Sequence, residues 1–88
     1  MNPETEVRRI LIDVLNLDVS PTQLPDETRL LGGGLMLSSL VGMQVIFELE
    51  KRFGIQIHVV ELTRDVFRDI KHLVAFVSGK VETVPLED

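Results

Sequence analysis

The stretch Leu31-Gly32-Gly33-Gly34-Leu35-Met36-Leu37-Ser38-Ser39-Leu40 decides how this chain folds, because its glycines and serines lead directly into an apolar helical pattern. That pattern predicts a helix from about Ser39 to Phe53, with Gly54 as a typical C-terminal stop. The expected buried stripe of this helix is Leu40, Met43, Ile46, Leu49 and Phe53, with Val45 as a further candidate. At its start, unpaired backbone N–H groups point outward and the helix dipole favours an anion. A serine there can cap the helix or carry a phosphate-linked group, and the serines alone leave both alternatives open.

Apolar periodicity predicts two further main helices. The first runs from Pro3 to about Asn16, because proline suits a first helical position and apolar residues then recur at helical spacing. The last helix is capped by Asp69, runs to about Val77 and is expected to end at Gly79. The predicted interior of the three helices includes Ile10, Val14, Ile46, Leu49, Phe53, Phe67 and Val74.

A long irregular connection, residues 18–38, separates the first two helices and contains two prolines and three glycines. Long ordered loops are uncommon unless they serve a function. We expect Leu24, Leu30 and Leu31 to anchor this loop on the core.

The segment after Gly54 alternates like a strand over Ile55–Val59 but has no strand to pair with, so an extended loop with Ile55 and Ile57 inward is expected. A short helical turn near Val60–Asp65 should follow. The predicted fold class is therefore all-α, a small four-helix bundle of three main helices and one short one. Residues 1–79 form the domain, and residues 80–88 are expected to be a flexible tail.

Composition excludes several classes of function. The 88 residues contain no cysteine, so disulfides and thiolate metal sites are excluded, and the only two histidines, His58 and His72, have no supporting ligand pattern. The net charge of −5 and the scattered basic residues argue against nucleic acid as a partner. No apolar run is long enough to span a bilayer, and the polar start is not a signal peptide. A soluble cytoplasmic location is the simplest expectation.

Three motifs in order resemble the acyl carrier protein family, which includes the peptidyl and aryl carrier domains of assembly-line synthases. Gly34-Leu35-Met36-Leu37-Ser38-Ser39-Leu40 is similar to the family signature Gly-Leu-x-Leu-Asp-Ser-Leu. The stretches Glu48–Ile55 and Phe67–Ile70 match at the end of the second helix and before the last. The resemblance covers about Glu4 to Val77. It implies that Ser39, the serine before Leu40, carries phosphopantetheine through a phosphodiester, while Ser38 replaces the usual aspartate.

The resemblance further implies a carrier protein and no enzyme. The chain would hold an acyl or aminoacyl group as a thioester on the arm and present it to its partners. These would be a phosphopantetheinyl transferase and the enzymes that load and condense acyl or aminoacyl groups. The residues expected to contact them are Ser38, Leu40, Val41, Gln44, Phe47, Glu48 and Lys51.

The alternative is a cofactor-free helical module for protein–protein interaction. The glycines do not form a nucleotide-binding loop, because no Gly-Lys-Ser/Thr follows them and no strand precedes them. No nucleophile, base and orienting group can be assembled into an independent active site.

The charge of the second helix helps to distinguish carriers of fatty acid synthesis from carriers of other pathways. Its acidic residues Glu48 and Glu50 are balanced by Lys51 and Arg52, which together form a solvated face. Carriers of fatty acid synthesis typically have a strongly acidic second helix. We therefore expect a specialised pathway of polyketide, nonribosomal peptide or modified lipid synthesis, and a free-standing monomer.

Overall fold

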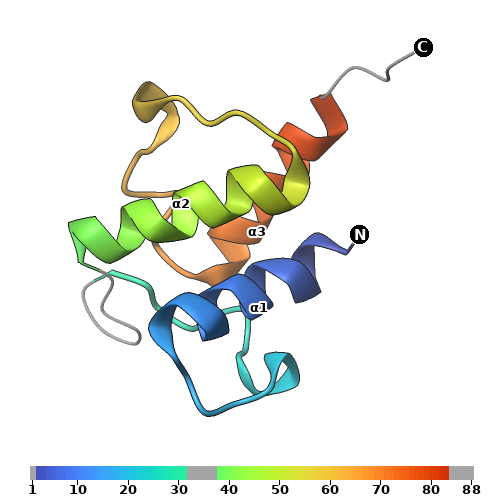
Figure 1. The fold of residues 1–88 in the computed structure, drawn as a ribbon, viewed down its shortest axis with the longest axis vertical. Coiled ribbons are helices and arrows are strands. Elements are labelled where there is room, and N and C mark those ends of the chain that lie inside the picture. The colour runs from blue at the N-terminus through green and yellow to red at the C-terminus, as the bar shows by residue number, and fades with distance from the viewer. Residues whose placement is uncertain (1, 32–37, 84–88) are drawn as a thin grey trace.

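The computed structural model describes residues 2–31 and 38–83, and three α-helices account for most of that part (Figure 1). They are α1 (Pro3–Leu15), α2 (Ser39–Phe53) and α3 (Ile70–Thr83), with the one-turn 3₁₀ helices η1 (Pro21–Gln23) and η2 (Val59–Glu61) between them. The predicted all-α fold with three main helices is confirmed. The expected fourth helix near Val60–Asp65 is only a single 3₁₀ turn, so the described part is not a four-helix bundle.

Helix α1 contacts both of the other main helices (Figure 1). It begins at the Asn2 cap, whose Oδ1 accepts a hydrogen bond of 2.9 Å from the backbone N–H of Glu4. It ends at Asn16 in the left-handed conformation, with φ of 55°. Both boundaries agree with the sequence prediction, because side-chain capping and a left-handed residue are the usual signals for a start and a stop.

The core is built from the inner faces of the three helices and from the connections between them. Ile55 and Ile57 point inward as expected, and Leu24 and Leu30 anchor the first loop. The fully buried side chains of largest volume are Ile10, Leu11, Leu30, Leu49, Ile70, Leu73, Val7, Val45 and Val77. Of the predicted interior residues, Ile10, Ile46 and Leu49 are buried, whereas Val14, Phe53, Phe67 and Val74 are half-buried against the core.

The predictions that Leu40 and Met43 are buried and that Leu31 anchors the first loop on the core were wrong. Leu40 is 77% exposed, and Met43 and Leu31 lie at the surface with 37% and 36% exposed. Residues 40–47 of α2 include only one polar side chain, that of Gln44, so helical spacing alone did not identify which stripe faces inward. Val45, the further candidate, does belong to the buried stripe.

The first loop supplies the cap of α3. The backbone N–H of Ile70 donates to the carbonyl of Thr28 at 3.1 Å, and that of Lys71 donates to the carbonyl of Asp26 at 2.9 Å. The N–H of His72 donates to Asp69 Oδ1 at 2.9 Å. These groups have no partner within a helix, so the loop and Asp69 together satisfy the start of α3.

The C-terminal end of α3 lies beyond its predicted position. The helix continues through Gly79 to Thr83, so Gly79 does not end it. One glycine costs a helix only about 1 kcal/mol, and Lys80 follows it with an ion pair to Glu61 at 2.7 Å. Residues 84–88 of the expected tail lie outside the described residues.

Leucine truncations on the two faces of α2 should have opposite consequences. Leu49→Ala should lower the free energy of unfolding by about 2–5 kcal/mol, because Leu49 is fully buried. The matched Leu40→Ala change, on an exposed side chain, should stay within about 0.5 kcal/mol. Urea unfolding followed by circular dichroism measures both, and similar losses at the two positions would contradict the packing described here.

Asp69 should stabilise the fold in a pH-dependent way. Hydrogen bonds from the His72 side chain and backbone N–H hold the pKa of the Asp69 carboxyl below its ordinary value. Its contribution is therefore present above the unfolded pKa of about 3.9 and is lost as pH falls through the lower folded value.

Asp69→Asn keeps a capping side chain but removes the charge, so it should lower stability at pH 7 by about 0.3–1 kcal/mol. Urea unfolding from pH 7 downward should show the two proteins converging in acid. Asp18→Asn, at an exposed position, serves as the control and should change little. A wild-type advantage that stayed constant into strong acid would refute this role of the carboxylate.

Candidate functional site

The N-terminus of α2 is capped by Ser38. This residue is extended, with φ of −82° and ψ of 166°, and its Oγ accepts a hydrogen bond of 3.2 Å from the N–H of Val41. Its carbonyl accepts from the N–H of Gly42 at 2.7 Å. Ser39 is the first residue of the helix, and the first turn contains no acidic residue. The preceding residues 32–37, which include Met36 of the signature motif, lie outside the described residues.

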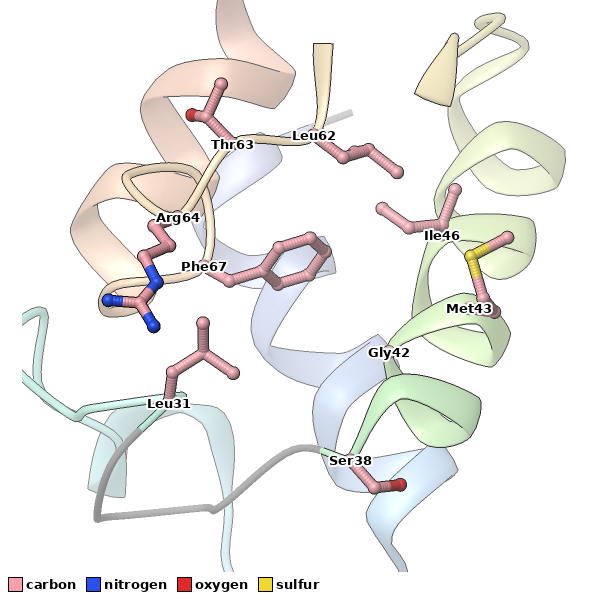
Figure 2. Close-up of a pocket in the computed structure, with 9 residues that line it drawn as sticks. All are labelled: Leu31, Ser38, Gly42, Met43, Ile46, Leu62, Thr63, Arg64 and Phe67. Atoms are coloured by element: carbon pink, nitrogen blue, oxygen red, sulfur yellow. The ribbon is translucent and has the colours of Figure 1, made fainter. Parts of the chain in front are cut away.

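An apolar pocket of about 260 Å³ opens beside this helix start (Figure 2). Gly42, Met43 and Ile46 of α2 form one wall, and the segment 62–67 forms the other, with the Phe67 ring reaching across between them. The complete lining is Leu31, Ser38, Gly42, Met43, Ile46, Leu62, Thr63, Arg64 and Phe67. Its apolar surface suits an aliphatic group better than a polar one.

Two glutamates hold the wall opposite α2 in place. Glu50 Oε2 accepts a hydrogen bond of 2.8 Å from the N–H of Ile57, which ties the extended segment to α2. Glu61 Oε2 accepts from the N–H of His58 at 2.9 Å, and the Glu61 carboxylate also binds Lys80. The hydrogen bond from Lys80, followed by that from His58, lowers the pKa of Glu61. Sequence analysis missed both roles, although Glu61 stands three residues after His58, the spacing of a capping box.

The residues expected to contact partners lie along the outer side of α2. Leu40 and Phe47 are 77% and 55% exposed, Gln44 and Lys51 are exposed, and Val41 and Glu48 are half-buried. Leu40, Met43 and Phe47 are separated by three and four positions, so they form one exposed apolar stripe. Glu48 is paired with Lys51 at 3.5 Å and with Arg52 at 3.9 Å, so its charge is largely balanced within the helix.

The two histidines lie apart from this site. His72 contacts Asp69 at the start of α3, with 2.6 Å between His72 Nδ1 and Asp69 Oδ1, and His58 precedes η2. Within residues 2–31 and 38–83 no three potential ligands gather around a possible metal position. No helix in the described part is long and apolar enough to cross a membrane.

Comparison with known proteins agrees with this geometry. The pattern that defines the phosphopantetheine attachment site family matches residues 5–77. The solution NMR structure of the holo acyl carrier protein from Nitrosomonas europaea is also similar. It has 33% sequence identity, covers 93% of this chain and 99% of its own, and superposes with a TM-score of 0.80. No curated protein sequence gave a significant match.

The chain therefore belongs to the phosphopantetheine attachment site family, and its resemblance to acyl carrier proteins is confirmed. It is a carrier protein for acyl groups held on covalent phosphopantetheine, and carriers of this kind are not enzymes. The residue that bears the group stays a prediction at this point, as do the residues that contact partners.

Gly42 offers a direct test of the pocket wall. A Cβ added there would meet no atom within 4 Å, so Gly42→Ala should stabilise the protein by about 0.5–1 kcal/mol through reduced freedom of the unfolded chain. Gly54→Ala is the opposing control. Gly54 has φ of 64°, a conformation that is strained for alanine, so this replacement should destabilise the protein. Thermal unfolding compares the two, and destabilisation by Gly42→Ala would show that this wall is packed rather than open.

Proposed function

We propose that Ser39 carries the phosphopantetheine group, bound through a phosphodiester at its hydroxyl. The observation that carries this assignment is its place as first residue of α2, between Ser38, which lines the apolar pocket, and exposed Leu40. The neighbouring Ser38 oxygen is already engaged as the helix cap. A helix N-terminus with no acidic side chain of its own also favours a phosphodiester anion.

When attached, the arm supplies a thiol that holds an acyl or aminoacyl group as a thioester. The chain's own residues position and shelter that group. The backbone N–H groups at the start of α2 attract the phosphodiester, and the apolar pocket next to Ser38 accommodates an aliphatic chain in retracted form. Tethering raises the concentration of the group at each enzyme that docks.

Intact mass after incubation with coenzyme A and a broad-specificity phosphopantetheinyl transferase tests this assignment. The mass increase should persist in Ser38→Ala and vanish in Ser39→Ala, with both variants folded by circular dichroism. Continued modification of Ser39→Ala would show that another residue is the attachment point. Absence of modification in the wild-type chain would instead favour the cofactor-free interaction module.

We further propose that the protein serves a specialised pathway of polyketide, nonribosomal peptide or modified lipid synthesis in the cytoplasm. The charges of α2 sum to zero, and Glu48 is engaged by two basic neighbours. The outer side of the helix instead presents the apolar stripe of Leu40, Met43 and Phe47. Partners of such a carrier would be selected by apolar contact at this face, because buried aromatic anchors dominate many interfaces.

Partner preference follows from this surface. Phe47→Ala should reduce acyl transfer by a dedicated partner enzyme more than Glu48→Ala does. The loss caused by Phe47→Ala should depend weakly on ionic strength, because this change removes no charge and salt screens only charges. Turnover by ordinary fatty acid synthase enzymes should be poor. Steady-state rates at low and high salt measure both effects, and efficient, salt-sensitive elongation by fatty acid synthase enzymes would return the protein to primary metabolism.

A further inference from the structure

Three arginines from two distant parts of the sequence meet on one side of the apolar pocket. Arg29 of the first loop and Arg64 and Arg68 of the segment before α3 line a second hollow of about 480 Å³, together with Leu31 and Asp65. Backbone pairing brings them together, because Arg29 forms an antiparallel bridge with Asp69 and the N–H of Leu30 donates to the carbonyl of Arg68 at 3.1 Å. We call Arg29, Arg64 and Arg68 the arginine patch.

Most cations in the described part of this acidic chain are paired with carboxylates, but two of the three members of the arginine patch, Arg29 and Arg64, are not. Arg68 binds Asp65 at 3.1 Å. Within the described residues, neither the Arg29 nor the Arg64 guanidinium has an ion pair or hydrogen bond. All three arginines are exposed, and Asp65 is the only acidic residue in the lining. A local excess of positive charge thus lies on a chain whose net charge is −5.

The arginine patch is continuous with the carrier site. Leu31 and Arg64 line both the hollow and the apolar pocket, whose opposite rim includes Ser38 (Figure 2). An enzyme that reaches the attached group must approach this rim. Its surface would meet exposed Leu40 on α2, the Arg64 guanidinium of the facing segment and the Arg29 guanidinium of the first loop.

Resting on the carrier function proposed above, we propose that the arginine patch binds an acidic surface of the enzyme that acts on the attached group. Carboxylates on that enzyme would pair with Arg29 and Arg64, while Leu31 and Leu40 contact apolar side chains between them. Arginine is enriched at interfaces because its planar fork pairs with carboxylates and tolerates desolvation. Complementary charge of this kind raises the association rate and excludes partners with basic docking surfaces.

An acidic protein surface fits the arginine patch better than the carboxylate of a small cargo. The guanidinium groups are exposed, and an exposed pair with a single carboxylate is weak in water. Several carboxylates fixed on one surface act together and cover the arginines from solvent, which strengthens each pair. The two occupants remain distinguishable by experiment.

Nuclear magnetic resonance titration of the ¹⁵N-labelled protein tests the proposal with a synthetic peptide of alternating glutamate and serine. The peptide should shift the Arg29, Arg64 and Arg68 resonances, including their side-chain Nε–Hε signals, and high salt should weaken binding. Arg29→Gln/Arg64→Gln should bind about fivefold more weakly, the loss expected of two exposed ion pairs. The matched control, Arg9→Gln/Lys71→Gln, removes the same charge from exposed positions outside the hollow and should bind like the wild type.

Three results would overturn the proposal. The first is that the peptide shifts no resonance of the arginine patch. The second is that a peptide with glutamine in place of glutamate binds equally well. The third is that glutarate, at the same carboxylate concentration, causes shifts as large as those of the peptide, which would indicate a site for small anions. The titration is run on unmodified protein and on protein whose modification is verified by mass. A chain that binds the peptide but accepts no phosphopantetheine would refute the carrier assignment alone, whereas a modified chain without patch shifts would refute the docking proposal alone.

Discussion

The fold depends on one partly buried cation, Arg8 of α1. Only 11% of its side chain is exposed, and its guanidinium donates to the carbonyl of Leu24 at 2.7 Å, to that of Glu4 at 3.0 Å, and to the Asp26 carboxylate. A charge removed from water must be paired and hydrogen-bonded to be tolerated. The part of the first loop around Leu24 and Asp26 therefore passes across α1 at this place and is held there.

This part of the loop in turn positions the start of α3 and one wall of the apolar pocket. With Asp26 held by Arg8, the backbone carbonyls of Asp26 and Thr28 lie where the first N–H groups of α3 need acceptors. The same stretch then pairs with Arg68, next to the segment that forms one wall of the apolar pocket. The carrier site thus lies between α2, which supplies its own cap at Ser38, and a wall whose location is set from α1 through the loop.

Sequence reasoning recovered the parts of the structure that local chemistry determines. The start and end of α1, the span of α2 and the Asp69 cap follow from residues adjacent to each boundary. The errors arose where the answer depends on the tertiary arrangement. Leu40 satisfies the helical period but lies on the outer side of α2, whose first half has apolar residues on several sides, and Gly79 is too weak a breaker to end α3.

The candidate site likewise combines features that neighbouring residues determine with features that depend on the tertiary arrangement. The motif around Ser38 and Ser39 is readable in one dimension, because capping residues are neighbours in the chain. The Glu61–Lys80 pair joins residues 19 positions apart, and the pocket and the arginine patch bring together residues of different elements. Helical periodicity within one segment does not predict such contacts. A chain whose basic residues look scattered can therefore still gather three of them at one hollow.

The neutral first turn of α2 has a thermodynamic consequence. Most helices offset the positive end of their dipole with acidic side chains, as α1 does with Glu4 and Glu6, but α2 has none there. A phosphodiester on Ser39 would be the first negative charge at that end, and it would stabilise the helix by as much as the helix stabilises the anion. The free energy by which the helix favours the attached arm is then equal to the free energy by which the attached arm stabilises the helix.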